Sequence, residues 1–109
     1  MIIKKDPTLG DLQAYTKEVC AKNGWDKGGH LETWLLFTEE IGELAKAIRN
    51  HNKLYQEAAK GDNKANLEEE FADVLSYVFH LANDFDIDLE KAFREKEAIN
   101  AKRSWGGDN

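Results

Sequence analysis

Two acidic blocks, each set into an otherwise apolar helical face, constrain the fold of this chain more than any other feature. The first block runs from Glu39 to Glu43 in the pattern E-E-x-x-E, and the second runs from Glu70 to Asp73 in the pattern E-x-x-D after 26 intervening residues. At about 100° per residue, Glu40 and Glu70 each fall within the arc that the apolar side chains of their helix occupy. The chain therefore repeats one design in two helices.

The carboxylates of these blocks form two close pairs. Positions i and i+3 are neighbours on one helix face, so Glu40 pairs with Glu43 and Glu70 pairs with Asp73. An antiparallel hairpin of the two helices would bring the pairs together. Carboxylates in an apolar seam are costly unless they are paired or bound to metal, and oxygen donors of this kind suit Mg²⁺ or Mn²⁺. The pattern therefore predicts a divalent-cation site formed by all four residues.

Most acidic residues on helices simply face solvent. We interpret in this way the carboxylates that lie off the apolar arc or at its rim, namely Glu32, Glu39, Glu68 and Glu69. The prediction of a metal site is restricted to the two inward-facing pairs.

Length and composition favour a single helical domain. The chain has 109 residues, 33% charged and 41% hydrophobic, with one proline, which is typical of a globular protein with little room for a many-stranded sheet. We therefore expect one domain over 1–109 and an all-α fold. The net charge of −6 argues against a nucleic-acid binder, and the lone Cys20 excludes an intramolecular disulfide. No segment approaches the roughly 18 apolar residues of a membrane span, so we expect no membrane partner and a cytoplasmic location.

Capping signals and apolar periodicity predict the individual helices. Thr8 with Asp11, Asn66 with Glu69, and Asp88 are suitable N-caps. The expected helices run from Thr8 to about Lys22, from Leu31–Thr33 to about His51, from about Leu67 to Asn83, and from about Leu89 to Arg103, with one or two further turns possible within 54–60.

The outer helices carry apolar stripes and, in one case, a basic face. The first helix is expected to pack on the hairpin through Leu12, Tyr15 and Val19. Phe93 and Ile99 belong to a stripe that the last helix is expected to bury. The same helix presents Lys96, Asn100 and Arg103 on one face, which is either a set of charges near a helix C-terminus or a ligand-binding surface.

The motifs in their surroundings resemble a known family, the MazG-like, all-α nucleotide pyrophosphohydrolases, relatives of dimeric dUTPases and phosphoribosyl-ATP pyrophosphohydrolases. The segments that carry the resemblance are 38–47, 71–77 and 87–93, followed by the basic face of the last helix. The resemblance covers about 25–105 and implies a bundle of four to five helices around a central antiparallel hairpin.

The resemblance also implies an activity, namely Mg²⁺-dependent hydrolysis of a nucleoside triphosphate, deoxy- or noncanonical, to the monophosphate and pyrophosphate in nucleotide-pool house-cleaning. Carried over residue by residue, Glu40, Glu43, Glu70 and Asp73 would bind the metal, and Glu39 would be an auxiliary acid beside Glu40 that orients water. Lys96, Asn100 and Arg103 would bind phosphate, and the base would lie against Trp25, Trp34 or Phe37. Members of the family generally work as homodimers or as tetramers built from dimers.

Other functions are compatible with parts of this pattern. A phosphoribosyl-ATP pyrophosphohydrolase would keep the fold and the metal, whereas a noncatalytic helical interaction module would use the acidic cluster to bind a basic partner. A di-iron bundle normally uses Glu-x-x-His on its helices, a motif that does not occur in the sequence. No sequence feature fixes the base that the chain selects.

Overall fold

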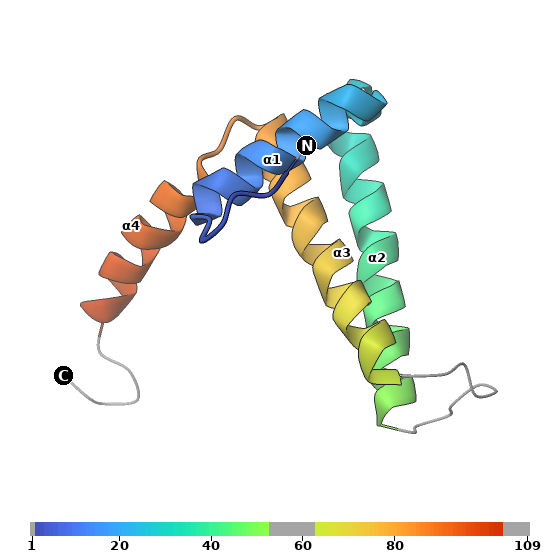
Figure 1. The fold of residues 1–109 in the computed structure, drawn as a ribbon. Coiled ribbons are helices and arrows are strands. Elements are labelled where there is room, and N and C mark those ends of the chain that lie inside the picture. Colours follow the sequence, from blue (N-terminus) through green and yellow to red (C-terminus); the bar gives the residue numbers. More distant parts are fainter. Residues whose placement is uncertain (1, 53–62, 104–109) are drawn as a thin grey trace.

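The computed structural model describes the backbone of residues 2–52 and 63–103, which is helical apart from short connections (Figure 1). Its elements in chain order are α1 (Leu9–Asn23), the short 3₁₀ helix η1 (Trp25–Lys27), α2 (Gly29–His51), α3 (Asn63–Asp84) and α4 (Leu89–Ala101). The described residues contain no strand, so the predicted all-α fold is confirmed.

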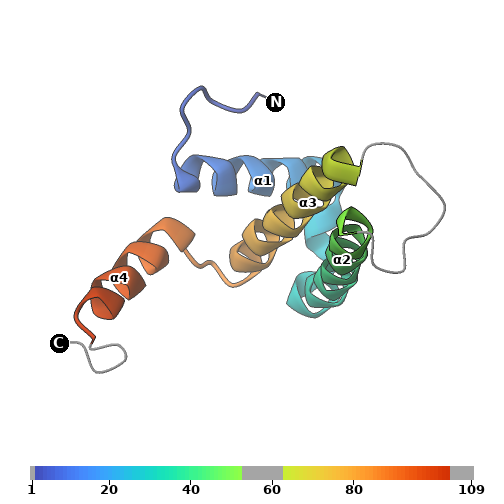
Figure 2. The same ribbon diagram turned by 90° about the horizontal axis from the view of Figure 1, so that it is seen from below.

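The centre of the fold is an antiparallel hairpin of α2 and α3. The two helices lie side by side along most of their length, and α1 crosses the end of the hairpin near which α2 begins and α3 ends (Figures 1 and 2). The predicted packing of the first helix on the hairpin is confirmed. Among the described residues, the buried ones are Gln13, Cys20, Thr33, Ala47, Phe79, His80 and Ala82.

Local capping chemistry fixes both ends of α1. The Thr8 hydroxyl oxygen accepts a hydrogen bond from the Asp11 backbone N–H at 3.0 Å, and the Asp11 carboxylate accepts one from the Thr8 N–H at 2.9 Å. These two bonds form the predicted capping box. Gly24 ends the helix with φ of 74°, a left-handed conformation that glycine adopts without steric cost.

The predicted first residues of the two hairpin helices, α2 and α3, need correction. α2 begins at Gly29 rather than within Leu31–Thr33. α3 begins at Asn63, so Asn66 lies inside the helix and the prediction that it is the N-cap was wrong. Lysine and alanine, which precede Asn66, are good helix formers, and they allow the helix to extend past a residue that could have capped it. The helical turns predicted within 54–60 lie outside the described residues.

α4 departs from the hairpin. Asp88 caps it as predicted, accepting a hydrogen bond from the Lys91 N–H at 3.1 Å, and the helix ends at Ala101, two residues before the predicted Arg103. It extends away from α2 and α3 and packs chiefly against α1 (Figures 1 and 2). Phe93 is consequently 56% exposed, so the prediction of a buried apolar stripe on this helix was wrong for the single chain.

A buried glutamine fixes the direction of α4. The Gln13 side-chain amide donates to Asn83 Oδ1 at 2.9 Å and to the Ile87 carbonyl at 2.6 Å, and its oxygen accepts from the Leu89 N–H at 3.1 Å. The Glu90 carboxylate in turn accepts from the Gly10 N–H at 3.0 Å. Because these bonds join α1 to both sides of the α3–α4 connection, they set the angle at which α4 leaves the bundle.

Candidate metal centre and adjoining cleft

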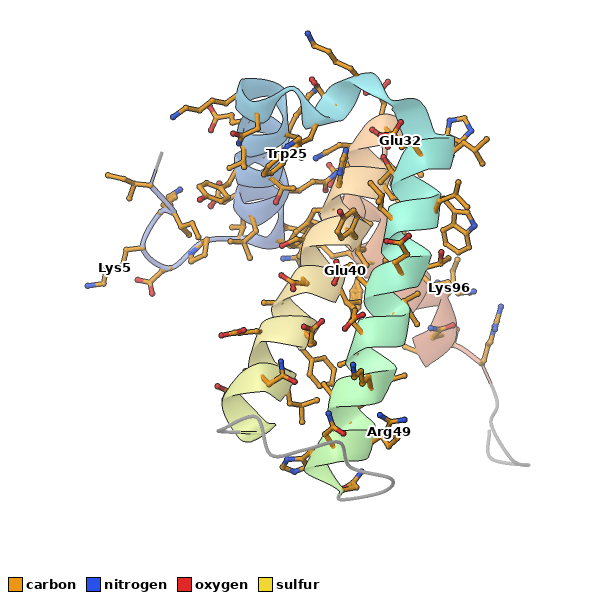
Figure 3. The ribbon with its side chains drawn as sticks, turned by 90° about the vertical axis from the view of Figure 1, so that its right-hand side faces the viewer. Lys5, Trp25, Glu32, Glu40, Arg49 and Lys96 are labelled. Atoms are coloured by element: carbon orange, nitrogen blue, oxygen red, sulfur yellow. The ribbon has the colours of Figure 1, made fainter. Side chains whose placement is uncertain are left out.

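Three carboxylates converge between α2 and α3. Glu40 of α2 and Glu70 and Asp73 of α3 each offer one oxygen, and these oxygens lie within 4.8 Å of one another. Glu40 and Glu70 are half-buried and Asp73 is exposed. Figure 3 shows Glu40 on the side of α2 that faces α3. The hairpin thus joins the two acidic blocks of the sequence.

The fourth predicted ligand lies beside this group rather than in it. Glu43 is exposed and is not part of the set of oxygens within 4.8 Å. A residue three positions along a helix is rotated by about 60° from the first, which turns Glu43 toward the rim. Its carboxylate still contributes to raising the pKa of Glu40, and so does the exposed Glu39.

The electrostatics of the cluster favour a cation. Burial raises the pKa of Glu40, and the carboxylate of Asp73 raises it further. Burial and then Asp73 and Glu40 raise the pKa of Glu70 in the same way. Glu70 Oε2 is also buried without a hydrogen-bond partner among the described residues. Oxygen donors that repel one another and include an orphaned atom fit a hard divalent cation, which would relieve both costs.

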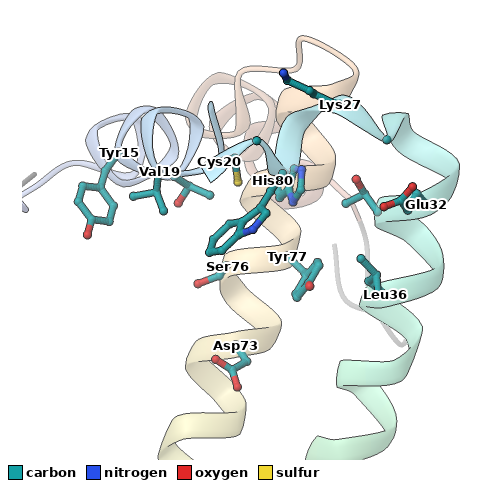
Figure 4. A pocket seen from close by; sticks show the side chains of 15 residues that line it. Tyr15, Val19, Cys20, Lys27, Glu32, Leu36, Asp73, Ser76, Tyr77 and His80 are labelled. Atoms are coloured by element: carbon teal, nitrogen blue, oxygen red, sulfur yellow. The ribbon is translucent and has the colours of Figure 1, made fainter. Parts of the chain in front are cut away.

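A cleft of about 770 Å³ adjoins the cluster (Figure 4). One face of α3 forms its wall through Asp73, Ser76, Tyr77 and His80, which are spaced as successive turns of a helix. The remaining lining comes from α1, from η1 and its flanking glycines, and from the first half of α2: Tyr15, Thr16, Val19, Cys20, Gly24, Trp25, Lys27, Gly28, Glu32, Thr33 and Leu36. Because Asp73 belongs to both, the carboxylate cluster and the cleft form one continuous site.

The aromatic residues predicted to contact a base are placed differently from one another. Trp25 lines the cleft, whereas Trp34 and Phe37 are not among its lining residues. Phe37 instead stacks on Tyr77, with ring centroids 6.3 Å apart, and Trp34 meets Phe37 edge-on. Sequence reasoning missed Tyr77 as a lining residue, although its position one turn after Asp73 was a usable signal. Burial, and then the Glu40 carboxylate, raise the pKa of the Tyr77 phenol.

The basic face of α4 does not join the acidic cluster within one chain. Lys96, Asn100 and Arg103 are absent from the lining of the cleft, and α4 extends away from the hairpin (Figures 1 and 2). The Asn100 amide donates to the Glu97 carboxylate at 3.2 Å, and Lys96 and Arg103 are exposed. None of the helices in the described part of the chain is long and apolar enough to cross a membrane.

Comparison with known proteins extends this description. Residues 29–103 match the model of the MazG nucleotide pyrophosphohydrolase domain. The uncharacterized protein YvdC of Bacillus subtilis is 32% identical over 96 residues, which cover 81% of this chain and 91% of YvdC. The dCTP pyrophosphatase 1 of Rattus norvegicus is 31% identical over 101 residues, which cover 90% of this chain and 59% of that protein. The crystal structure of YPJD from Bacillus subtilis superposes with a TM-score of 0.70 at 32% identity, over 93% of this chain and 100% of that one.

Proposed function

Because the chain belongs to the family of MazG nucleotide pyrophosphohydrolase domains, we propose that it hydrolyses a deoxy- or noncanonical nucleoside triphosphate to the monophosphate and pyrophosphate. The observation that carries the proposal is the continuity of the carboxylate cluster with a cleft large enough for a nucleoside. The relationship to dCTP pyrophosphatase 1 supports the same substrate class. The domain spans 1–109, and its role is house-cleaning of the nucleotide pool in the cytoplasm.

Glu40, Glu70 and Asp73 would hold Mg²⁺, or alternatively Mn²⁺, with the exposed Glu43 as a further carboxylate at the rim. A cation held there would neutralise charge on the phosphate oxygens and would make the attacking water more acidic. Glu39, exposed next to Glu40, orients the attacking water, and the pair of carboxylates accepts its proton.

The nucleoside occupies the cleft beyond Asp73. The Trp25 and Tyr77 rings line this space and provide apolar surfaces for a planar base. Phe37 supports the Tyr77 ring from behind rather than contacting the base, and Trp34 supports Phe37.

The site is completed by a second copy of the chain. α4 holds its basic face away from the cluster of its own chain, and large apolar side chains on α2, α3 and α4 are exposed: Leu31, Leu35, Ile41, Ile48, Phe71, Leu75, Phe93 and Ile99. Exposed apolar surface on this scale is typical of an interface. The chain forms a homodimer, or a tetramer of two such dimers, in which Lys96, Asn100 and Arg103 of one copy bind the phosphates held at the acidic cluster of another.

Pyrophosphate release tests the proposed function. The assay uses a panel of canonical and modified nucleoside triphosphates together with phosphoribosyl-ATP, each with Mg²⁺ and with chelator. Metal-dependent release from a nucleoside triphosphate is the expected result. Release from phosphoribosyl-ATP alone would mean that phosphoribosyl-ATP, and not a nucleoside triphosphate, is the substrate. No release from any compound of the panel would favour a noncatalytic interaction module.

Lys96→Ala is expected to raise the KM for the preferred triphosphate about tenfold while kcat falls less, because an exposed ammonium that binds phosphate contributes similarly to substrate and transition state. Steady-state kinetics measures both parameters. Lys91→Ala is the control, since Lys91 lies on the same helix and pairs with Glu95 at 2.9 Å. A KM that responds equally to both substitutions would show that the Lys96 face is only a solvated surface.

A further inference from the structure

His80 lies farther along α3 from the carboxylate cluster than any other lining residue of the cleft that this helix supplies (Figure 4). It is seven residues beyond Asp73, or about 10 Å along the helix. A triphosphate held at Asp73 would therefore extend its base, not its phosphates, toward His80. His80 as a whole is only 9% exposed, and its ring packs against Tyr77, with ring centroids 6.1 Å apart. A polar ring so deeply placed ordinarily has a hydrogen-bond partner.

The described residues give His80 no such partner on one side of the ring. Its Nε2 is buried without a hydrogen bond and lies 3.8 Å from Asp84 Oδ1, while Asp84 Oδ2 is also buried and unpartnered. Asp84 does not line the main cleft, and it lines instead a smaller cavity of about 330 Å³ that His80 also lines. The adjacent carboxylate favours the tautomer that carries its proton on Nε2. The nitrogen left for a ligand in the main cleft is then Nδ1, an acceptor.

A second buried side chain in the lining of the cleft, Thr33, is also a hydrogen-bond acceptor toward a ligand, as Nδ1 of His80 is. Thr33 is buried, and its hydroxyl donates to the Gly29 carbonyl at 3.1 Å. Since the hydroxyl proton is used within α2, the Thr33 oxygen can only accept a hydrogen bond from a ligand. Two buried residues that can each accept a hydrogen bond in one cleft match a group with two N–H donors, and an exocyclic amino group of a nucleobase is such a group.

We propose that His80 is a specificity-determining residue that accepts a hydrogen bond from the exocyclic amino group of the base, so that the enzyme prefers cytosine over uracil and adenine over hypoxanthine. Asp84 is a positioning residue that holds the proton on the opposite ring nitrogen. The inference rests on the proposed function, because it takes the cleft to be the nucleoside site.

The test is the ratio of kcat/KM for dCTP to that for dUTP, which differ at position 4 by an amino group against a carbonyl oxygen. The wild-type ratio is expected to be about tenfold or more, and His80→Phe, which keeps a ring against Tyr77, should bring it close to one. A ratio changes only when the two substrates respond differently, so a general loss of folded enzyme leaves it untouched. A wild-type ratio near one, or a ratio that His80→Phe leaves in place, would overturn the proposal.

Asp84→Asn tests the positioning role and should lower the same ratio about threefold, because an amide no longer favours a proton on Nε2. Asp86→Asn is the matched control. Asp86 has φ of 55°, a conformation that asparagine tolerates, and it is exposed two residues away. Equal ratios of kcat/KM for dCTP to dUTP in the two variants would contradict the positioning role of Asp84.

A binding measurement separates this inference from the proposed hydrolysis. Calorimetric titration with dCMP and with dUMP in the presence of Mg²⁺ requires no turnover. Tighter binding of dCMP that His80→Phe abolishes would support base selection even if no triphosphate were hydrolysed, in which case the proposed function alone would fail. Equal affinities for the two monophosphates in the wild type would overturn the inference whatever the activity.

Discussion

Glu40→Gln is expected to reduce Mg²⁺-dependent pyrophosphate release by about a thousandfold or more. Glu40 is the carboxylate that α2 contributes to the group within 4.8 Å, and glutamine keeps its size while removing its charge. The measurement is release at saturating substrate and metal. Glu68→Gln is the matched control, since Glu68 is an exposed acidic residue of α3 outside the group. Full activity in the Glu40 variant would contradict the assignment of the metal centre.

The same substitution should stabilise the protein in the absence of metal at neutral pH. Folding raises the pKa values of Glu40 and Glu70 above the ordinary glutamate value of 4.5, so the folded state holds their protons more tightly than the unfolded state does. Their favourable contribution is complete below about pH 4.5 and is lost as the pH rises through the raised pKa values. Glutamine at position 40 removes a carboxylate charge that burial desolvates and that the neighbouring carboxylates repel.

Thermal unfolding in chelator measures this effect. The melting temperature of Glu40→Gln should exceed that of the wild type at pH 7 to 8, and the difference should disappear as the pH approaches 4.5. Added Mg²⁺ should raise the melting temperature of the wild type more than that of the variant, because binding to the native state stabilises it. A difference that stays constant with pH would show that the carboxylates of the cluster do not repel one another.

Interactions confined to a few neighbouring residues could be predicted from the sequence. Thr8 and Asp88 cap their helices as expected because each accepts from a backbone N–H three residues away. The direction of α4 could not be predicted in this way. It depends on Gln13, whose side-chain amide bonds to groups 70 or more residues away in the sequence. The sequence does not show which hydrogen-bond partner a polar residue in an amphipathic stripe will have.

The site shows the same division between local and distant information. The helical period placed Glu40 opposite Glu70 and Asp73, and the hairpin brings these three together. The cleft is built from α1, η1, α2 and α3 at once, so its lining could not be deduced from any one helix. No motif in the sequence singles out His80, and the 3.8 Å approach of its Nε2 to Asp84 Oδ1 is seen only in the side-chain arrangement.

Leu35→Glu is expected to convert an oligomeric wild-type protein into a monomer with little activity. Leu35 is 58% exposed on α2, and Leu31, one turn before it on the same face, is 65% exposed. A charge placed in an apolar interface costs several kcal/mol because it must be desolvated, which is enough to separate a modest dimer. Light scattering coupled to size exclusion gives the mass, against 12.4 kDa for one chain. Circular dichroism verifies that the helices are retained.

Ala14→Glu controls for the added charge, since Ala14 is exposed on α1, away from the apolar face of α2. A wild type that is monomeric and active, or a Leu35→Glu variant that remains oligomeric, would contradict the shared site.

Mixing subunits provides the decisive comparison. Glu40→Gln lacks a complete acidic cluster, and the double variant Lys96→Ala/Arg103→Ala lacks basic groups on α4. If one copy supplies the carboxylates and another the cations, a mixed dimer contains one site in which both sets are intact. At a substrate concentration far below the KM of the double variant, mixing the two variants should therefore raise pyrophosphate release above the sum of the separate variants, whereas sites confined to single chains would give no increase.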